Sequence, residues 1–156
     1  MPETSAQIPP ATSSTVLYTE RLWPAVWIWI VVLGISGAGI LVFAPINMTS
    51  GYIAAIVLFL IQAVMLYTST PTIEVTPATL RVGRATIERS LLGTVEAFEG
   101  AEATAERGVR LNGLTYLCIR GWISSVVKIQ ILDPQDKTPY WLASTRHPAA
   151  LVKALS

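Results

Sequence analysis

Two long apolar segments dominate the pattern of the first half of the chain. Residues 25–44 read AVWIWIVVLGISGAGILVFA and contain no charged side chain. At about 1.5 Å per residue, a helix of this length matches the roughly 30 Å hydrocarbon core of a bilayer. After a short polar turn, residues 51–68 form a second apolar run of helical length. The pattern therefore predicts a hairpin of two membrane-spanning helices within residues 18–69.

The residues around these segments support the same interpretation. Tyr18, Trp23 and Trp27 cluster at the start of the first segment, and such amphipathic rings favour the headgroup level of a bilayer. Residues 1–17 are rich in Ser, Thr and Pro, so we expect a disordered tail. This tail carries no basic residue, which argues against a signal peptide, and a second apolar segment follows at once.

Basic residues predict the orientation of the hairpin. The turn between the two apolar segments contains no Lys or Arg, whereas Arg21 precedes the first segment and several arginines follow the second. Cytoplasmic flanks carry the excess of basic residues. We therefore expect a protein of the cell membrane with two spans and both termini in the cytoplasm.

Residues 70–156 change to short runs in which apolar and polar positions alternate, a pattern typical of β-strands. Asn112-Gly113 indicates a hairpin turn, and residues 101–108 fit a short helix or an acidic loop. The prediction is an α+β domain with a small, strongly curved sheet or partly open barrel, closed by a C-terminal helix in a pleckstrin-homology-like order. The expected strands are 72–76, 79–83, 85–89, 93–98, 114–119, 126–132 and 139–144, followed by a helix over 148–155.

Composition narrows the possible functions. Only 13% of the residues are charged and the net charge is +1, so there is no basic surplus of the kind that nucleic-acid binding requires. The single cysteine, Cys118, excludes an internal disulfide and a thiol-rich metal site. Its apolar surroundings predict a buried, inert thiol. No cofactor is expected.

The only histidine, His147, lies in the polar cluster TPYWLASTRHPAAL. Pro148 fits the first position of a helix, which makes His147 the N-cap of the final helix. A catalytic alternative would pair His147 with Ser144 or Asp133, but their spacing does not force them together. A single histidine with scattered acids does not make a metal site. We therefore favour a structural cap over catalysis.

Several residues of the apolar segments are candidates for helix packing. Gly34, Ala38 and Ser36 with Gly37 are small enough to allow a close helix approach, and Gln62 needs a hydrogen-bond partner across the hairpin. Neither segment contains an ionisable residue, so a substrate pathway is not expected.

Several arginines of the second half are candidates for binding a lipid or a protein. Those near the second span can contact anionic headgroups or form a solvated face with Glu74 and Glu88. An arginine beside a tryptophan is favoured at interfaces. The candidates are Arg81, Arg84, Arg89, Arg120 and Trp122.

Two stretches, YTERLWPAVWIW at 18–29 and LDPQDKTPYWLASTRHPAAL at 132–151, resemble the signatures of an actinobacterial family of small membrane proteins of unknown function. The resemblance implies a two-helix anchor followed by a compact β-rich domain. It implies no activity, cofactor or catalytic residue. Residues 99–113 match no pattern of that family, so their role is open.

These observations lead to three functional hypotheses. The first is a non-enzymatic membrane anchor whose cytoplasmic β domain docks a protein partner or a second copy of the chain. The second is a module that binds anionic lipid headgroups. The third is a membrane-surface enzyme that uses His147.

Overall fold

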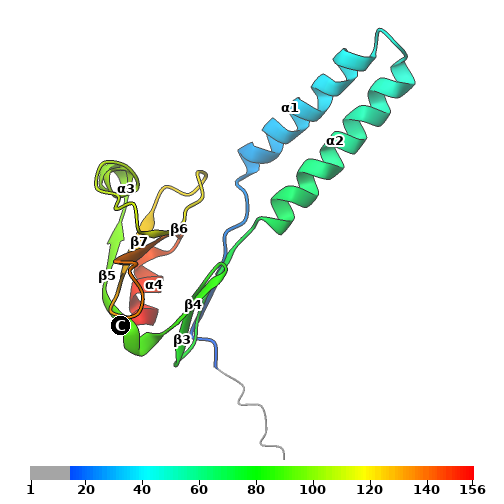
Figure 1. Ribbon diagram of the computed structural model, residues 1–156. Helices are drawn as coiled ribbons and strands as arrows, with labels where there is room; N and C mark the ends of the chain where they lie inside the picture. Colours follow the sequence, from blue (N-terminus) through cyan, green and yellow to red (C-terminus); the bar gives the residue numbers. More distant parts are fainter. Residues whose placement is uncertain (1–14) are drawn as a thin grey trace, which may run out of the picture.

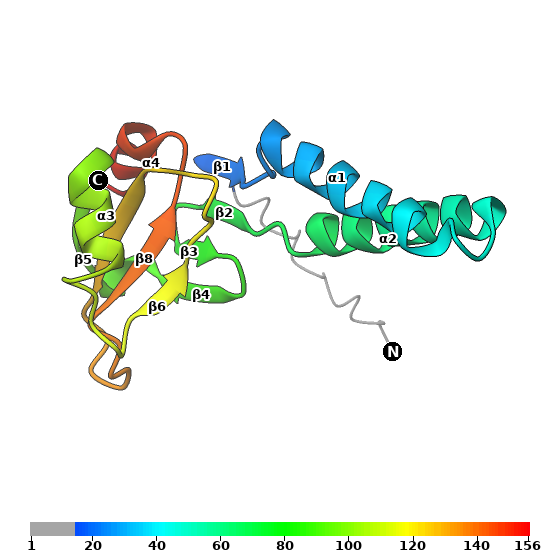
Figure 2. The same cartoon turned by 90° about the horizontal axis from the view of Figure 1, so that it is seen from above.

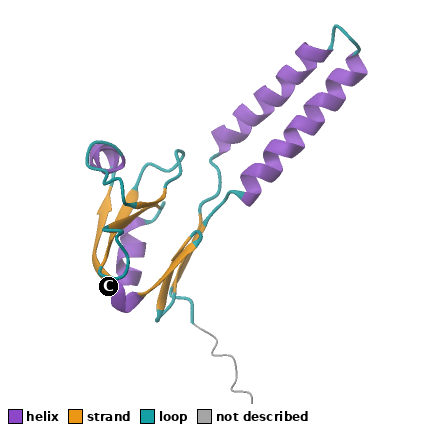
Figure 3. Cartoon of the chain, in the orientation of Figure 1, coloured by secondary structure: helices purple, strands orange, loops and turns teal. Residues whose placement is uncertain are grey.

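The computed structural model describes residues 15–156, which form a helical hairpin and a β-rich domain at its open end (Figure 1). Most of the segment predicted to be a disordered tail, residues 1–14, lies outside the described residues. The predicted α+β class is confirmed: two helices are followed by two small sheets and a C-terminal helix. Figure 3 shows the two long helices apart from the strands, whereas the two short helices lie beside the strands.

The hairpin consists of α1, Val26–Phe43, and α2, Met48–Thr68. Both helices are long and apolar enough to cross a membrane, and only 17% and 6% of their apolar windows are buried. A helix in the core of a soluble protein would be largely covered. Asn47 caps α2, since its side-chain oxygen accepts a hydrogen bond from the Thr49 amide at 2.9 Å. The cap explains why α2 begins at Met48, before the predicted start at residue 51.

The first sheet contains a strand that the sequence analysis missed. β1, Tyr18–Arg21, pairs antiparallel with β2, Thr72–Val75, and joins Tyr18 to Val75 and Arg21 to Thr72. β3, Thr79–Val82, and β4, Ala85–Glu88, complete the order β1-β2-β3-β4. The hairpin is therefore an insertion between two neighbouring strands. The β domain is discontinuous in sequence and does not begin at residue 70 as predicted.

The second sheet follows a short 3₁₀ turn, Arg89–Leu91, and has the order β5-β7-β8-β6. Its strands are β5 Leu92–Phe98, β6 Tyr116–Cys118, β7 Val126–Ile131 and β8 Tyr140–Ser144. Helix α3, Gly100–Arg107, connects β5 to the loop before β6. The hairpin predicted at Asn112-Gly113 is wrong, because β6 pairs in parallel with β8. Asn112 instead shapes a local turn by accepting the Leu114 amide.

The core lies between the two sheets. Alternate residues of β2, β3, β7 and β8 point into it, and helix α4, Pro148–Leu155, contacts β1, β5 and β7 (Figure 2). Helix α3 covers the other face of the second sheet through Ala103. β8 is consequently buried along its whole length. Two sheets thus replace the single curved sheet that we predicted, and no barrel closes within residues 15–156. The main core residues are Leu22, Ile73, Val75, Leu80, Val82, Val127, Ile129, Trp141 and Leu151.

Candidate functional site

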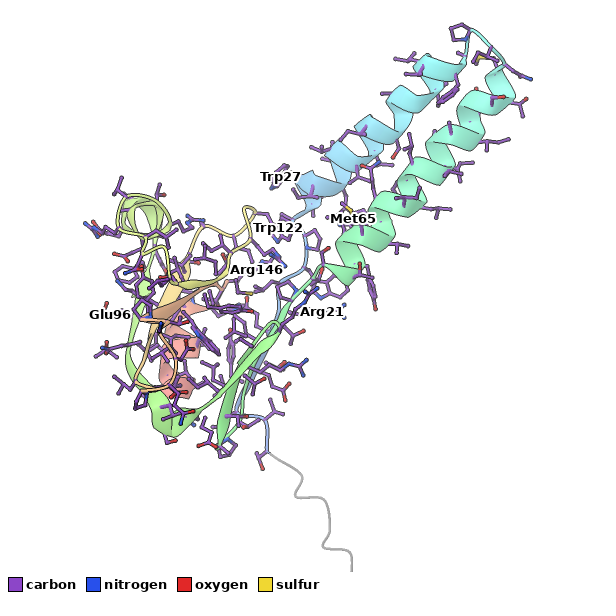
Figure 4. All side chains as sticks on the ribbon, in the orientation of Figure 1. Arg21, Trp27, Met65, Glu96, Trp122 and Arg146 are labelled. Atoms are coloured by element: carbon purple, nitrogen blue, oxygen red, sulfur yellow. The ribbon has the colours of Figure 1, made fainter. Side chains whose placement is uncertain are left out.

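The β domain is attached directly to the open end of the hairpin. Four residues, 22–25, separate β1 from α1, and three residues, 69–71, separate α2 from β2. Linkers this short leave the domain little freedom to move away from the helix ends. Figure 4 shows Arg21, Trp27, Trp122 and Arg146 gathered around this junction, whereas Glu96 lies on the far side of the domain.

A cation–aromatic cluster lies at the junction. The Arg21 guanidinium stands 4.3 Å from the centre of the Trp23 ring and 4.9 Å from the centre of the Tyr67 ring. The two rings lie 5.7 Å apart. Stacking of this kind stabilises a guanidinium by about 0.5–2 kcal/mol. It also links β1 to the last turn of α2.

The loop between β6 and β7 is tied to the end of α2 by Arg120. One terminal nitrogen of Arg120 donates to the Ser69 carbonyl at 2.7 Å, and the other donates to the Ile119 carbonyl at 3.0 Å. The guanidinium also lies 6.0 Å from the Trp122 ring. Arg107 holds the same loop from α3, by donating to the carbonyls of residues 123 and 124. The Arg120 guanidinium is thereby fixed in position.

A cavity of about 520 Å³ opens beside this junction. Its walls come from the α2–β2 linker, the outer face of β2 and β3, the β3–β4 turn and β6, so segments that are distant in sequence meet there. Volumes of about 300–1,000 Å³ are typical of small-molecule sites. The charged residues of the lining are Arg81, Arg84, Arg120 and Glu74, and the other lining residues are Thr68, Ser69, Thr70, Pro71, Thr72, Gly83, Tyr116, Leu117 and Cys118.

The cavity contains more positive charge than its surroundings neutralise. Among residues 15–156, none of its three arginines lies within 4.0 Å of a carboxylate oxygen. Glu74 and Arg81 are cross-strand neighbours, yet Arg81 donates only to the Gly83 carbonyl at 3.4 Å. The Nε of Arg120 is buried and has no hydrogen-bond partner. Guanidinium groups with free N–H donors suit carboxylate or phosphate oxygens.

The β3–β4 turn explains how Arg84 reaches the cavity. Val82 pairs with Ala85, so Gly83 and Arg84 form a two-residue turn. Gly83 has a φ of +61°, which a residue with a side chain adopts only at a cost. The Gly83 amide donates to the Thr72 carbonyl at 2.9 Å. The turn is consequently held against the start of β2.

Cys118 also lines the cavity, but its sulfur is part of the wall. Burial raises the pKa of the Cys118 thiol, and the charge of Arg120 opposes this shift only in part. The thiol is free and buried, in agreement with the expectation of an inert cysteine.

The predicted arginine group is only partly brought together. Arg81, Arg84 and Arg120 share the cavity, with Trp122 on the adjoining loop. Arg89 lies elsewhere, because its guanidinium donates to the Leu155 carbonyl at the end of α4. It fixes the C-terminal helix and does not line the cavity.

His147 occupies the N-cap position of α4 and Pro148 the first helical position, but the His147 side chain makes no capping hydrogen bond. His147 and Pro148 thus hold the positions predicted for them, but the imidazole contributes no capping hydrogen bond. The side chain is 68% exposed, and its Nδ1 lies 3.9 Å from a Glu20 oxygen. The hydroxyl of Thr145 accepts the His147 amide instead.

The catalytic alternative finds no support in the positions of its residues. The Ser144 hydroxyl accepts the Arg120 amide at 3.0 Å on the inner side of β8. Asp133 lies in the β7–β8 turn, where its carboxylate accepts the Gln135 amide. Neither contacts the His147 side chain in the described part of the chain.

The hairpin contact uses only some of the small residues predicted for it, namely Ser36 but not Gly34 or Ala38. Val32, Ser36 and Gly39 are the buried residues of α1, and Gly51 is the buried residue of α2. Within the hairpin, the prediction of Gly34 and Ala38 at this contact is wrong, since both are exposed. Gln62 does cross to α1, where its amide donates to the Ser36 hydroxyl at 3.3 Å.

Sequence reasoning also missed the most connected carboxylate of the domain, Glu20. Its side chain is only 8% exposed. It accepts hydrogen bonds from the Tyr18 hydroxyl at 2.7 Å, the Thr145 hydroxyl, and the Arg146 amide at 2.8 Å. The Arg146 side chain continues to the Trp23 carbonyl. The two motifs quoted for the family resemblance therefore interlock at the hairpin base.

Comparison with known proteins identifies a family for this chain. No curated protein and no solved structure matches the chain. The model of a family described as "Protein of unknown function (DUF3093)" matches residues 17–155. The match begins just before β1 and ends at the last residue of α4, so it includes the hairpin and both sheets. The chain belongs to the DUF3093 family.

Proposed function

We propose that this protein is a non-enzymatic membrane protein whose two-helix anchor holds the β domain at the inner membrane surface, where the domain binds an anionic lipid headgroup. The observation that carries the proposal is the cavity beside the end of α2, lined by three arginines that lack carboxylate partners. An anion there would meet donors that the protein itself leaves unpaired.

The position of the cavity favours a lipid over a soluble anion. Its wall includes residues 68–70, the last turn of α2 and the start of the linker. If α2 spans the bilayer, this wall lies at headgroup depth. Trp23, Tyr67 and Trp122 are the kind of aromatic residues that concentrate at that depth. An arginine near an anionic leaflet contributes about 1 kcal/mol to membrane attraction.

The orientation of the anchor follows from the same residues. The turn between α1 and α2, residues 44–47, has no basic side chain, whereas Arg21, Arg81, Arg84 and Arg120 surround the opposite end. The positive-inside rule places that end and both termini in the cytoplasm. We retain the pleckstrin-homology-like topology as part of the proposal, because two small sheets with a C-terminal helix follow its element order. The parallel pair of β6 and β8 departs from a simple antiparallel arrangement.

The test requires the whole chain, since a fragment starting at residue 70 would lack β1. The protein is purified in a non-ionic detergent and titrated with short-chain phospholipids in mixed micelles. Anionic phosphatidylglycerol and zwitterionic phosphatidylcholine are compared at equal mole fraction. Binding is followed by thermal shift. We expect stabilisation by the anionic lipid that weakens as salt is raised.

The matched variants separate the cavity from general electrostatics. Arg81→Gln combined with Arg84→Gln removes two cavity charges on exposed side chains, whereas Lys137→Gln removes one charge from the distant β7–β8 turn. The cavity variant is expected to lose most of the anionic stabilisation, and Lys137→Gln is expected to keep it. Equal stabilisation by both lipids, or an unchanged response of the cavity variant, would disprove headgroup binding.

Docking of a protein partner or a second copy is the second candidate. Val109, Leu114 and Leu117 are exposed apolar residues on or beside the loop between α3 and β6. Exposed apolar residues outside a membrane are typical of protein contacts. Replacing Val109 and Leu114 by Ser should abolish co-purification of a partner from gently solubilised membranes while leaving lipid binding intact, because neither residue lines the cavity. Recovery of the same partner with the variant would rule out this surface.

A further inference from the structure

The charges of the cavity also indicate which class of anion it takes. Three arginines and one glutamate contribute to the lining, which leaves a surplus of two positive charges. A phosphodiester headgroup carries one negative charge. A phosphomonoester carries about −1.5 to −2 near neutral pH and presents three strong acceptor oxygens. The surplus matches the monoester.

The unpaired N–H donors of the arginines also favour a phosphomonoester. The Arg84 guanidinium makes no hydrogen bond among residues 15–156, and Arg81 makes a single long one of 3.4 Å. Arg120 has a buried and unpartnered Nε, while its other two nitrogens are already bound to carbonyls. The three guanidinium groups come from β3, the β3–β4 turn and the segment after β6. Arg81 and Arg84 therefore supply the free donors, and Arg120 contributes positive charge. Donors that come from different segments suit a terminal phosphate, because its free oxygens point in several directions.

The carbonyls at the end of α2 restrict where an anion can lie in the cavity. The C-terminal end of a helix carries a partial negative charge of about half an electron, which repels an anion. Arg120 offsets this charge because it donates to the Ser69 carbonyl. The anion is therefore expected on the side of Arg81 and Arg84, away from the helix end.

We infer that the cavity selects a lipid with a terminal phosphomonoester, such as a phosphatidate, over lipids whose phosphate is a diester; this inference rests on the proposed headgroup function. The charged groups of the lining are three guanidinium groups and one carboxylate, and the guanidinium groups suit phosphate oxygens. The recognition therefore depends on the phosphate itself.

The experiment compares three probes with the full-length protein in non-ionic detergent: a short-chain phosphatidate, the matching phosphatidylglycerol, and soluble glycerol phosphate. Affinities are measured by thermal shift at pH 7.5 and at pH 5.5. We expect the phosphatidate to bind about tenfold more tightly than the diester at pH 7.5, because one further charge-assisted hydrogen bond is worth about 1.5 kcal/mol or more. At pH 5.5 the preference should shrink, since the second ionisation of a phosphomonoester lies near pH 6.

The titratable groups that face the bound phosphate are Glu74, Tyr116, Cys118 and the three arginines. A Glu74→Gln variant adds to the positive surplus. It should therefore strengthen binding of both lipids, and the pH-dependent preference for the monoester should persist in it. If the preference disappeared in this variant, the pH effect would belong to Glu74 and the inference would be wrong.

The remaining outcomes separate the inference from the proposed function. Equal affinity for the monoester and the diester lipid would overturn the inference and leave headgroup binding standing. Absence of binding by either lipid would overturn both. Glycerol phosphate that binds as tightly as phosphatidate would identify the ligand as a soluble phosphate and would overturn the lipid assignment. The Arg84→Gln variant, whose side chain is exposed and makes no other hydrogen bond, should lose the preference without a loss of folding.

Discussion

The hydroxyl of Thr145 donates a hydrogen bond to the buried carboxylate of Glu20, which lies 125 positions earlier in the chain. Glu20 belongs to β1, before the hairpin, and Thr145 follows β8, at the entrance to α4. This contact joins the first and last elements of the domain at the base of the helices. Burial of a carboxylate is costly, and here the hydrogen bonds from hydroxyl and amide donors offset that cost.

Replacement of Glu20 should therefore destabilise the whole domain. In Glu20→Gln, one acceptor oxygen becomes an N–H donor that faces the Thr145 hydroxyl or the Arg146 amide. Leaving such buried groups unpaired costs about 2 kcal/mol. The loss should appear as a lower free energy of unfolding, followed by tryptophan fluorescence in detergent. The matched control is Glu96→Gln, an exposed position on β5, which should change stability by less than about 0.5 kcal/mol.

The Tyr18 hydroxyl gives a prediction for alkaline pH. The pKa of Tyr18 is raised to about 12 from an ordinary value of 10.0; burial is the largest cause, the hydrogen bond with Thr145 opposes it, and the nearby Glu20 carboxylate adds to it. The unfolded chain thus loses this proton before the folded chain does. The contribution of Tyr18 to stability is complete below pH 10 and declines as the pH rises toward about 12.

The measurement is the free energy of unfolding of the wild-type protein and of Tyr18→Phe between pH 9 and pH 12. Phenylalanine cannot ionise, so the variant should show a shallower decline over this range. Spectroscopic titrations of the two proteins should differ by one phenolate, which forms near pH 12 in the folded wild-type protein and is missing from the variant. An identical alkaline decline for both proteins would contradict the assignment.

The hairpin contact can be tested with two glycines. A Cβ added at Gly51 would lie 3.1 Å from the Ile40 carbonyl oxygen and 3.2 Å from the Ile40 Cα, whereas a Cβ at Gly34 would meet nothing within 4 Å. Backbone atoms cannot move aside as a flexible side chain can. Gly51→Ala should lower the melting temperature in detergent, despite the better helix propensity of alanine. Gly34→Ala should be neutral or stabilising, and equal effects at both sites would place the contact elsewhere.

The proposed membrane orientation predicts the accessibility of single cysteines. In a Cys118→Ser background, Ile46→Cys introduces a thiol in the exposed turn of the hairpin, and Ser156→Cys introduces one at the end of α4. A membrane-impermeant maleimide should label the first in intact cells and the second only after lysis. Labelling of only the C-terminal thiol in intact cells would show that the orientation is the opposite one. Labelling of both thiols would contradict a spanning hairpin.

The sequence was sufficient to predict the elements that carry a local signal. The strands from β2 to β5, β7 and β8 follow their apolar alternation, and α4 occupies the predicted residues 148–155 because Pro148 starts it. The helices α1 and α2 follow from uncharged length alone. These local patterns are sufficient to predict the coarse α+β organisation.

What the sequence could not reveal depends on contacts between distant segments. β1 is only four residues long and lies directly before an apolar segment, so its local sequence does not identify it as a strand. Its pairing with β2 defines it. The parallel pairing of β6 with β8 overrides the turn signal at Asn112-Gly113. The cavity has no signature in sequence, since Arg81, Arg84 and Arg120 meet only through the two sheets and the end of α2. The sequence does contain a signal for Glu20. In an extended segment Glu20 lies on the same side as Tyr18 and Leu22, and this side faces the core.

The placement of β1 before the hairpin and β2 after it has a consequence for biosynthesis. β1 is made before either helix, and its neighbour is made only after both. In a bilayer, the first sheet can close solely when the second helix has returned the chain to its starting side. A chain that failed to return would keep β1 and β2 on opposite sides, each with an unpaired edge. Completion of the sheet therefore depends on correct insertion, and misinserted copies would be left with exposed strands for the cell's proteases to find.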